Sequence, residues 1–233
     1  FMAQANAKDM ISILSEEEFD LVNVRQSPTI TSPLTIIMES LPKKVYSHSA
    51  HTAVVAYILS GTAKNLPKDV ERSVFSRSVW QGGFYHHLGE CMITIKDKTQ
   101  IPIATEYLLK RKLKDDGCLD RGIVLEIARY HCECMDGSGY PKGLFGNQIP
   151  LAARLVGFAS RLDEMLTGRG GNLARNILKT ARFMQKNGAD LFGQDVMECF
   201  EKCQIEIFDL YFDRKFRCRT RQSEGEFFYE SEK

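Results

Sequence analysis

The sequence predicts an all-α protein built as a helical bundle, and three observations support this. Apolar residues recur at helical spacing along most of the chain, and the alternation of apolar and polar residues typical of strands is nearly absent. Prolines and glycines divide the helical stretches into segments of ordinary helix length. The composition, 43% hydrophobic and 26% charged over 233 residues, fits one large globular domain with at most a small appendage.

Four helices are predicted in the first ninety residues, over residues 8–25, 33–41, 49–60 and 68–88. Residues 8–25 are predicted to hold a short helix plus a turn, with Ser15 as an N-cap before three glutamates that favour a helix N-terminus. Prolines 33 and 42 bracket the second, and Gly61 ends the third. The pair Gly82-Gly83 lies inside the fourth, so we expect this helix to pack closely against a neighbour.

The second half of the chain predicts five more helices around one loop. They begin with a helix that has Pro102 in its first turn and continue over residues 121–131, 151–167, 172–187 and 195–212. The loop covers residues 133–150, and a polar tail follows Arg217. This arrangement places His131 at the end of a helix and directly before the loop.

Charge and cysteine content restrict the environment of the protein. A formal net charge of +1 indicates no global attraction to a nucleic acid polymer or a membrane surface. No apolar run approaches the ~20 residues that span a bilayer. The seven cysteines are odd in number and follow no secretory signal, which favours free thiols in the cytoplasm.

All five histidines fall in three short clusters, His48 with His51, the pair His86-His87, and His131. Because imidazole is the commonest metal-ligating side chain, this grouping predicts a shared site between helices. His48 is interpreted as an exposed residue at a helix start rather than a ligand. Adjacent helical residues point about 100° apart, so His86 and His87 can both face inward only where the helix is distorted or one ligates from the edge.

Two cysteines accompany His131, and two interpretations of them stay open. Cys132 and Cys134 are able to bind a soft metal ion, but buried structural thiols are at least as common. The loop that follows contains the glycine-rich turn Asp-Gly-Ser-Gly-Tyr-Pro at residues 136–141, where glycines permit tight backbone turns.

These residues carry a resemblance to a known family. The segment 131–144, HCECMDGSGYPKGL, resembles the pattern HHExxDGSGYPxGL of the HD-GYP subgroup of the HD superfamily of metal-dependent phosphohydrolases. The segment 85–90, YHHLGE, is similar to the family's LHDIGK, and His51 with the following Val55-Ala56 is similar to its HxxxVA segment. The resemblance covers roughly residues 45–205. It predicts an N-terminal helical segment at 1–44, the HD-GYP-like domain at 45–217 and a polar tail at 218–233.

The resemblance implies a fold, a chemistry and a set of site residues. Family members are helical domains, and active ones use two or three metal ions to hydrolyse the bacterial second messenger cyclic di-GMP. The implied metal ligands are His51, His86, His87, His131 and Cys132. The implied substrate-binding residues are Gly139, Tyr140 and Arg169, and no catalytic residue is assigned. Retention of the glycine-rich loop implies either a docking surface for a protein partner or a brace of the cavity.

Several positions depart from the family pattern. His87 stands where the family has the metal-bridging Asp, and Glu90 stands where it has a lysine. Three other ligand positions are changed, to Ile101, Cys132 and Ser160. A bridged pair of ions lies roughly 3.5–4 Å apart and needs donors that these substitutions remove. We therefore expect one divalent transition metal ion (Fe, Mn or Zn), or none.

Three functions remain open at this point. The first is a degenerate, catalytically impaired domain that binds a cyclic dinucleotide or another phosphoester and serves signalling. The second is a phosphohydrolase with a rebuilt metal site, in which Glu133 or Glu90 moves protons. The third is a structural domain whose cavity is filled by Ile101 and Met92 and whose histidines bond to backbone carbonyls.

Overall fold

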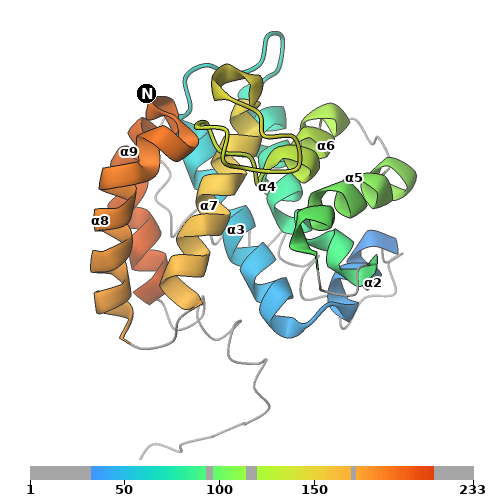
Figure 1. Ribbon diagram of the computed structural model, residues 1–233, viewed down its shortest axis with the longest axis horizontal. Helices are drawn as coiled ribbons and strands as arrows, with labels where there is room; N and C mark the ends of the chain where they lie inside the picture. Colours follow the sequence, from blue (N-terminus) through green and yellow to red (C-terminus); the bar gives the residue numbers. More distant parts are fainter. Residues whose placement is uncertain (1–32, 93–96, 114–119, 169–171, 213–233) are drawn as a thin grey trace, which may run out of the picture.

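The computed structural model describes residues 33–92, 97–113, 120–168 and 172–212. These residues form α-helices joined by short 3-10 turns, with one isolated bridge between Asp136 and Phe145 and no strand within the described ranges (Figure 1). The predicted all-α class is confirmed. The predicted helix at residues 8–25, the tail after Arg217 and Arg169 itself lie outside the described residues.

The first described helices are α2 (Pro33–Ser40), α3 (Lys43–Thr62) and α4 (Arg72–Tyr85). The prediction for α3 was six residues too short at its start, because the helix begins directly after Pro42 and buries Ser47 and Ser49. The prediction for α4 was too long at both ends. It stops at Tyr85, and the separate 3-10 turn η2 (Leu88–Met92) follows.

The close packing expected at Gly82-Gly83 is confirmed. A Cβ atom on Gly82 would lie 2.5 Å from Cδ1 of Ile127, and one on Gly83 would lie 3.1 Å from Cα of Ala53. The two glycines therefore let α4 pass directly against two different helices. This contact holds the C-terminal end of α4 in place beside α3.

The remaining helices are α5 (Ile101–Lys112), α6 (Arg121–Tyr130), α7 (Leu151–Thr167), α8 (Leu173–Phe192) and α9 (Gln194–Phe212). Side chains of Asp120 and Asn172 cap α6 and α8 by accepting backbone N–H groups, as favoured at helix starts. The prediction for α8 ended five residues early, because the helix runs through Gly188, which is buried against Met197.

Helix α7 lies at the centre of the bundle, between the α8–α9 pair on one side and α3 on the other (Figure 1). Most of its residues are buried, including Leu155, Phe158 and Leu162 in the larger core cluster. A second apolar cluster joins α2, the C-terminal end of α4, α5 and α6. The five histidines belong to segments that meet where these two halves of the molecule join, on α3, after α4 and after α6.

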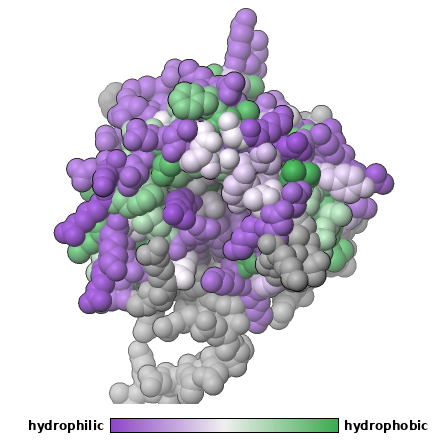
Figure 2. All heavy atoms as spheres, viewed as in Figure 1, coloured by the Kyte–Doolittle hydropathy of each residue, from purple (hydrophilic) through white to green (hydrophobic). Residues whose placement is uncertain are grey.

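Among the described helices, none combines the length and apolar character needed to cross a bilayer. On the face drawn in Figure 2, hydrophilic residues predominate and hydrophobic ones are scattered among them.

Candidate metal centre

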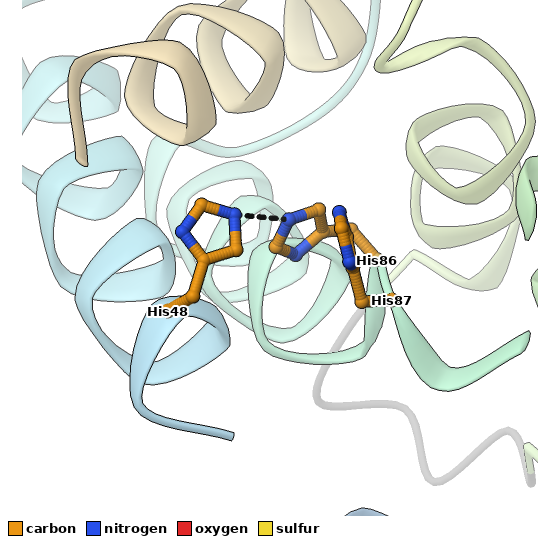
Figure 3. A group of neighbouring side chains, drawn as sticks. All are labelled: His48, His86 and His87. Atoms are coloured by element: carbon orange, nitrogen blue, oxygen red, sulfur yellow. Dashed lines mark hydrogen bonds between the residues drawn. The ribbon is translucent and has the colours of Figure 1, made fainter. Parts of the chain in front are cut away.

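Three imidazoles lie close together where α3 passes the C-terminal end of α4 (Figure 3). His48 comes from α3, and His86 and His87 follow α4 directly. Each offers one ring nitrogen such that the three nitrogens lie within 4.8 Å of one another. The closest measured pair joins Nε2 of His48 and Nε2 of His86, at 3.3 Å.

The interpretation of His48 as an exposed residue was wrong. Its side chain is only 13% exposed and contacts α7 through Asp163 and Ser160. The reason is the start of α3, which lies at Lys43 rather than near residue 49, so His48 sits inside the helix. His48 and His51 are three residues apart on that helix and therefore share one face.

His86 and His87 both reach the centre because the helix has already ended before them. His86 is the C-cap of α4, and the chain turns before the 3-10 segment that begins at Leu88. The centroids of the two rings lie 4.2 Å apart. His86 itself keeps α-helical dihedral angles, and the change to 3-10 geometry follows at Leu88.

The Nδ1 atoms of all five histidines face acceptors, and that of His51 contacts Asp163. His48 Nδ1–H donates to Asp163 at 2.6 Å and His87 Nδ1–H to Glu90 at 2.6 Å. His86 and His131 donate from Nδ1 to the backbone carbonyls of Gly83 (2.6 Å) and Ile127 (3.0 Å). An imidazole that donates from Nδ1 and is neutral carries its lone pair on Nε2, the arrangement found in metal-ligating histidines.

The electrostatics keep three of these imidazoles neutral near neutral pH. Burial, followed by the neighbouring imidazoles, lowers the pKa of His86 well below its ordinary value. Burial also lowers the pKa values of His87 and His131 to about 4. For His48, burial is outweighed by the hydrogen bond and charge of Asp163, which raise its pKa. Neutral rings are the form that binds a cation.

Asp163 is a fully buried acceptor on α7 that organises one side of the site. One of its oxygens accepts from His51 Nδ1–H and from the Tyr211 hydroxyl, each at 2.9 Å. The other accepts from His48 and from the hydroxyl of Thr167 at 3.3 Å. Burial would raise the pKa of this carboxyl, but the two histidines hold it well below its ordinary value. With four donors, the carboxylate has used its lone-pair directions.

His51, which the resemblance implies as a metal ligand, is 2% exposed and contacts the carboxylate oxygen of Asp163 that His48 does not contact. Its ring packs against Tyr211 with a centroid separation of 5.8 Å. It is not among the three imidazoles that the structure gathers. Its assignment as a ligand stays a prediction.

His131 lies beside the cluster, with its ring centroid 5.0 Å from that of His86. Its Nε2 atom is buried and has no hydrogen-bond partner within the described part of the chain. A buried lone pair without a donor is costly unless a cation or another acceptor of electron pairs uses it. The residues present therefore fit a divalent ion, and they fit it through imidazole nitrogen.

Cys132 follows His131 but faces the loop. Burial raises the pKa of its thiol to about 11, although the hydrogen bond with Tyr140 opposes this shift. A thiol with so high a pKa is a weak metal ligand, because the thiolate is the binding form. Its assignment as a ligand also stays a prediction, without support from proximity to the cluster.

The glycine-rich loop is held by its own backbone contacts. A Cβ atom on Gly139 would collide with the backbone of Cys134 and Glu133. Glu133 is 2% exposed, and its two oxygens accept the N–H groups of Lys142 (2.7 Å) and Leu144 (2.9 Å). Tyr140 N–H donates to the carbonyl of Cys132 at 3.2 Å. The loop conformation thus requires several of the residues found in it. Both oxygens of Glu133 hold the loop backbone, so this carboxylate is not free to move protons.

The cavity-filling residues of the third hypothesis behave differently from each other. Ile101 is 7% exposed, whereas Met92 is 52% exposed and so does not fill a cavity. The histidine–carbonyl bonds expected under that hypothesis do occur, at His86 and His131.

Two residues of the site escaped the sequence reasoning, His48 as a member of the cluster and Asp163 as its organiser. The spacing of His48 and His51 was a usable signal, since residues three apart lie on one helix face. No local sequence pattern connected these two histidines with Asp163, which lies 115 residues after His48 in the chain.

Comparisons with known proteins agree with this geometry. Residues 99–196 match the family model described as HD domain. A cyclic di-GMP phosphodiesterase of Thermotoga maritima is 35% identical over 86 residues, which cover 37% of this chain and 23% of that protein. A cyclic di-GMP phosphodiesterase response regulator of Xanthomonas campestris is 54% identical over 43 residues, or 18% of this chain and 11% of that protein.

A third relative matches over a longer stretch. The 3'3'-cGAMP-specific phosphodiesterase 1 of Vibrio cholerae is 28% identical over 127 residues, or 51% of this chain and 29% of that protein. The chain thus spans less than a third of the length of each of these three relatives. The helical bundle and the histidine cluster are in keeping with the match of residues 99–196 to the HD domain model.

Proposed function

We propose that this HD domain is impaired as a two-metal phosphodiesterase and acts as a binding module in cyclic di-GMP-related signalling. The relatives support the choice of ligand class, since their names assign them to cyclic di-GMP or 3'3'-cGAMP. The geometry of the site supports the loss of hydrolysis. Both carboxylates beside the histidines are occupied by hydrogen bonds, and the charge at position 90 is negative.

Both carboxylates that contact the histidines are occupied as hydrogen-bond acceptors, and this observation is the main support for the proposal. Asp163 accepts from His48, His51 and two hydroxyl groups, and Glu90 accepts from His87. Two-metal hydrolysis places its ions roughly 3.5–4 Å apart and needs a ligand that spans both. An imidazole at position 87 has one lone pair, so it cannot replace a bridging carboxylate.

The pair formed by His87 and Glu90 also reverses a local charge. The resemblance implies an acid at the first position and a lysine at the second, whereas here the acid comes second. Burial opposes ionisation of Glu90, but the hydrogen bond from His87 outweighs it and lowers the pKa of Glu90. A negative group at this place repels a phosphate that a lysine would attract. Productive seating of a phosphodiester beside the ion is thereby disfavoured.

The test combines a binding and a turnover measurement on the purified protein. We expect saturable binding of cyclic di-GMP or 3'3'-cGAMP by titration calorimetry, without product on chromatography in the presence of Fe²⁺, Mn²⁺ or Zn²⁺. Replacing the implied phosphate anchor, Arg169→Ala, should weaken binding about tenfold, the loss of one charge-assisted hydrogen bond. Metal-stimulated hydrolysis at ordinary enzymatic rates would overturn the proposal.

One observation favours a second candidate, a hydrolase that uses a single ion. Three imidazoles leave a position open on a tetrahedral ion, as in catalytic zinc sites, and a bound water would become a nucleophile there. Glu90 is then the remaining proton acceptor, because both oxygens of Glu133 hold the loop. Turnover of a small activated phosphodiester by protein containing one zinc per chain would support this candidate over the first.

A further inference from the structure

The histidine cluster contains one residue of α3, His48. The family resemblance implies His51 as the ligand contributed by α3. In the structure His51 is hydrogen-bonded to Asp163, and His48 is the residue of α3 that belongs to the cluster. The question is therefore which histidine of α3 meets the ion, and which ion the resulting donor set prefers.

The contact between His48 and His86 has a geometry that fits a cation bound by both rings. Both rings donate from Nδ1, to Asp163 and to the carbonyl of Gly83, so each Nε2 carries a lone pair when the ring is neutral. These two Nε2 atoms lie 3.3 Å apart (Figure 3). At this distance either one nitrogen carries a proton and donates to the other, or both carry lone pairs and face one positive ion.

The distance also matches a specific coordination. Two nitrogens bound to one zinc ion at about 2.05 Å and at the tetrahedral angle lie about 3.3 Å apart. The Ser160 hydroxyl, 3.1 Å from His48 Nε2, is able to donate to that lone pair in the absence of an ion. For His86 Nε2, the neighbour recorded within the described ranges is His48 itself.

The four supporting acceptors complete the arrangement. Asp163, Glu90 and the carbonyls of Gly83 and Ile127 orient the rings of His48, His87, His86 and His131. Such outer partners commonly set the tautomer and direction of metal-ligating imidazoles. His51 donates to the same carboxylate as His48, and so it supports the carboxylate rather than the ion.

We propose that His48, His86 and His87 bind a single ion through their Nε2 atoms, and that His51 acts through Asp163 as a positioning residue. The ion is of the zinc class, which imidazole favours, and not manganese or magnesium, which prefer carboxylate and water oxygens. This inference rests on the proposed function in taking the site to hold one ion. It adds the identity of the α3 ligand and the preference among metals.

The decisive experiment observes the histidines directly. Because the chain has five histidines, long-range ¹H–¹⁵N NMR of the full chain resolves their ring nitrogens, which shift on coordination. Titration of metal-free protein with zinc should shift Nε2 of His48, His86 and His87 and saturate at one equivalent. A shift of the His51 nitrogen that matches theirs, saturation at two equivalents, or no shift would overturn the inference.

Two matched variants of α3 test the same point by affinity. His48→Ala should weaken zinc binding about 100-fold or more, whereas His51→Ala should weaken it about tenfold, the range for a supporting residue. His48→Gln retains an N–H donor for Asp163, so it reports on the ligand if the alanine variant does not fold. Equal effects at the two positions, or a larger effect at His51, would contradict the assignment.

Metal competition separates this inference from the proposed function. Cobalt bound in a tetrahedral nitrogen site gives an intense visible absorption, which zinc should displace and a tenfold excess of manganese should leave unchanged. Displacement by manganese would overturn the metal preference. If the zinc protein hydrolyses cyclic di-GMP while these results hold, the proposed impairment fails and the ligand assignment stands.

Discussion

The glycine-rich loop and the histidine site are neighbours in the fold, but they match the family pattern to different extents. The loop keeps the residues of the family pattern, while the site has His87, Glu90 and Ser160 where that pattern has other groups. The loop is held by backbone constraints, since Gly139 has no space for a side chain and Glu133 binds two N–H groups. The site is held together by hydrogen bonds between side chains. A substituted side chain can therefore form a different hydrogen bond there while the helices keep their positions.

This difference limits what a retained motif shows. The residues of the loop are explained by its own folding, so their presence does not require a bound nucleotide. The substituted residues of the site form a satisfied set of their own, with His87 on Glu90 and His48 on Asp163. Variants in the loop should therefore affect stability, and variants in the site should affect metal binding.

The largest effect is expected at Gly139. A Cβ atom there meets the backbone of two residues, so Gly139→Ala should lower the free energy of unfolding by about 3 kcal/mol. Urea denaturation followed by circular dichroism measures this change. The control is Gly61→Ala, at a helical position with open space, which should be neutral or stabilising by up to about 1 kcal/mol. Wild-type stability of Gly139→Ala would show that the loop is not fixed by this contact.

A smaller loss of stability is expected at Glu133. Glu133→Gln places an amide NH₂ against one of two backbone N–H groups, which should cost about 2 kcal/mol. Zinc affinity should stay unchanged, because this carboxylate faces the loop. Glu126→Gln, the same change on the exposed side of α6, should alter stability by less than about 0.5 kcal/mol. A decrease in zinc affinity for Glu133→Gln would connect the loop to the site after all.

In the site, Glu90 should affect metal binding more than stability. Glu90→Gln weakens the acceptor that orients His87, and zinc affinity should fall about tenfold. Titration with a competing chelator measures this. Glu164→Gln removes the same charge from a half-exposed residue that pairs with Arg161, and should change affinity by less than about threefold. An equal fall in both variants would mean that charge near the ion matters, and orientation of His87 does not.

The smallest effect is expected at Ser160. Its hydroxyl contacts Nε2 of His48, the atom that we assign to the ion, so Ser160→Ala removes a competitor and should raise zinc affinity by about threefold or less. The same chelator titration detects the change. A tenfold fall would instead identify the Ser160 oxygen as a metal ligand.

Periodicity and punctuation were enough to predict the helical class, most helix positions and the close contact at Gly82-Gly83, because these depend on local pattern. The grouping of the histidines along the chain also pointed to a site near His86 and His87. The family motif indicated the HD superfamily, and residues 99–196 match the HD domain model.

Only the packing of the helices decided which histidine of α3 reaches the cluster. An error in the start of α3 made His48 look exposed, although the helix turns it toward Asp163, which is 115 residues away in the chain. The end of α4 before His86 was equally decisive for the two adjacent rings. The Nδ1 atoms of His86, His87 and His131 donate to acceptors three or four residues away in the chain, so the orientation of these rings is local. The rings of His48 and His51 are oriented by Asp163 on α7, a contact that no local pattern encodes.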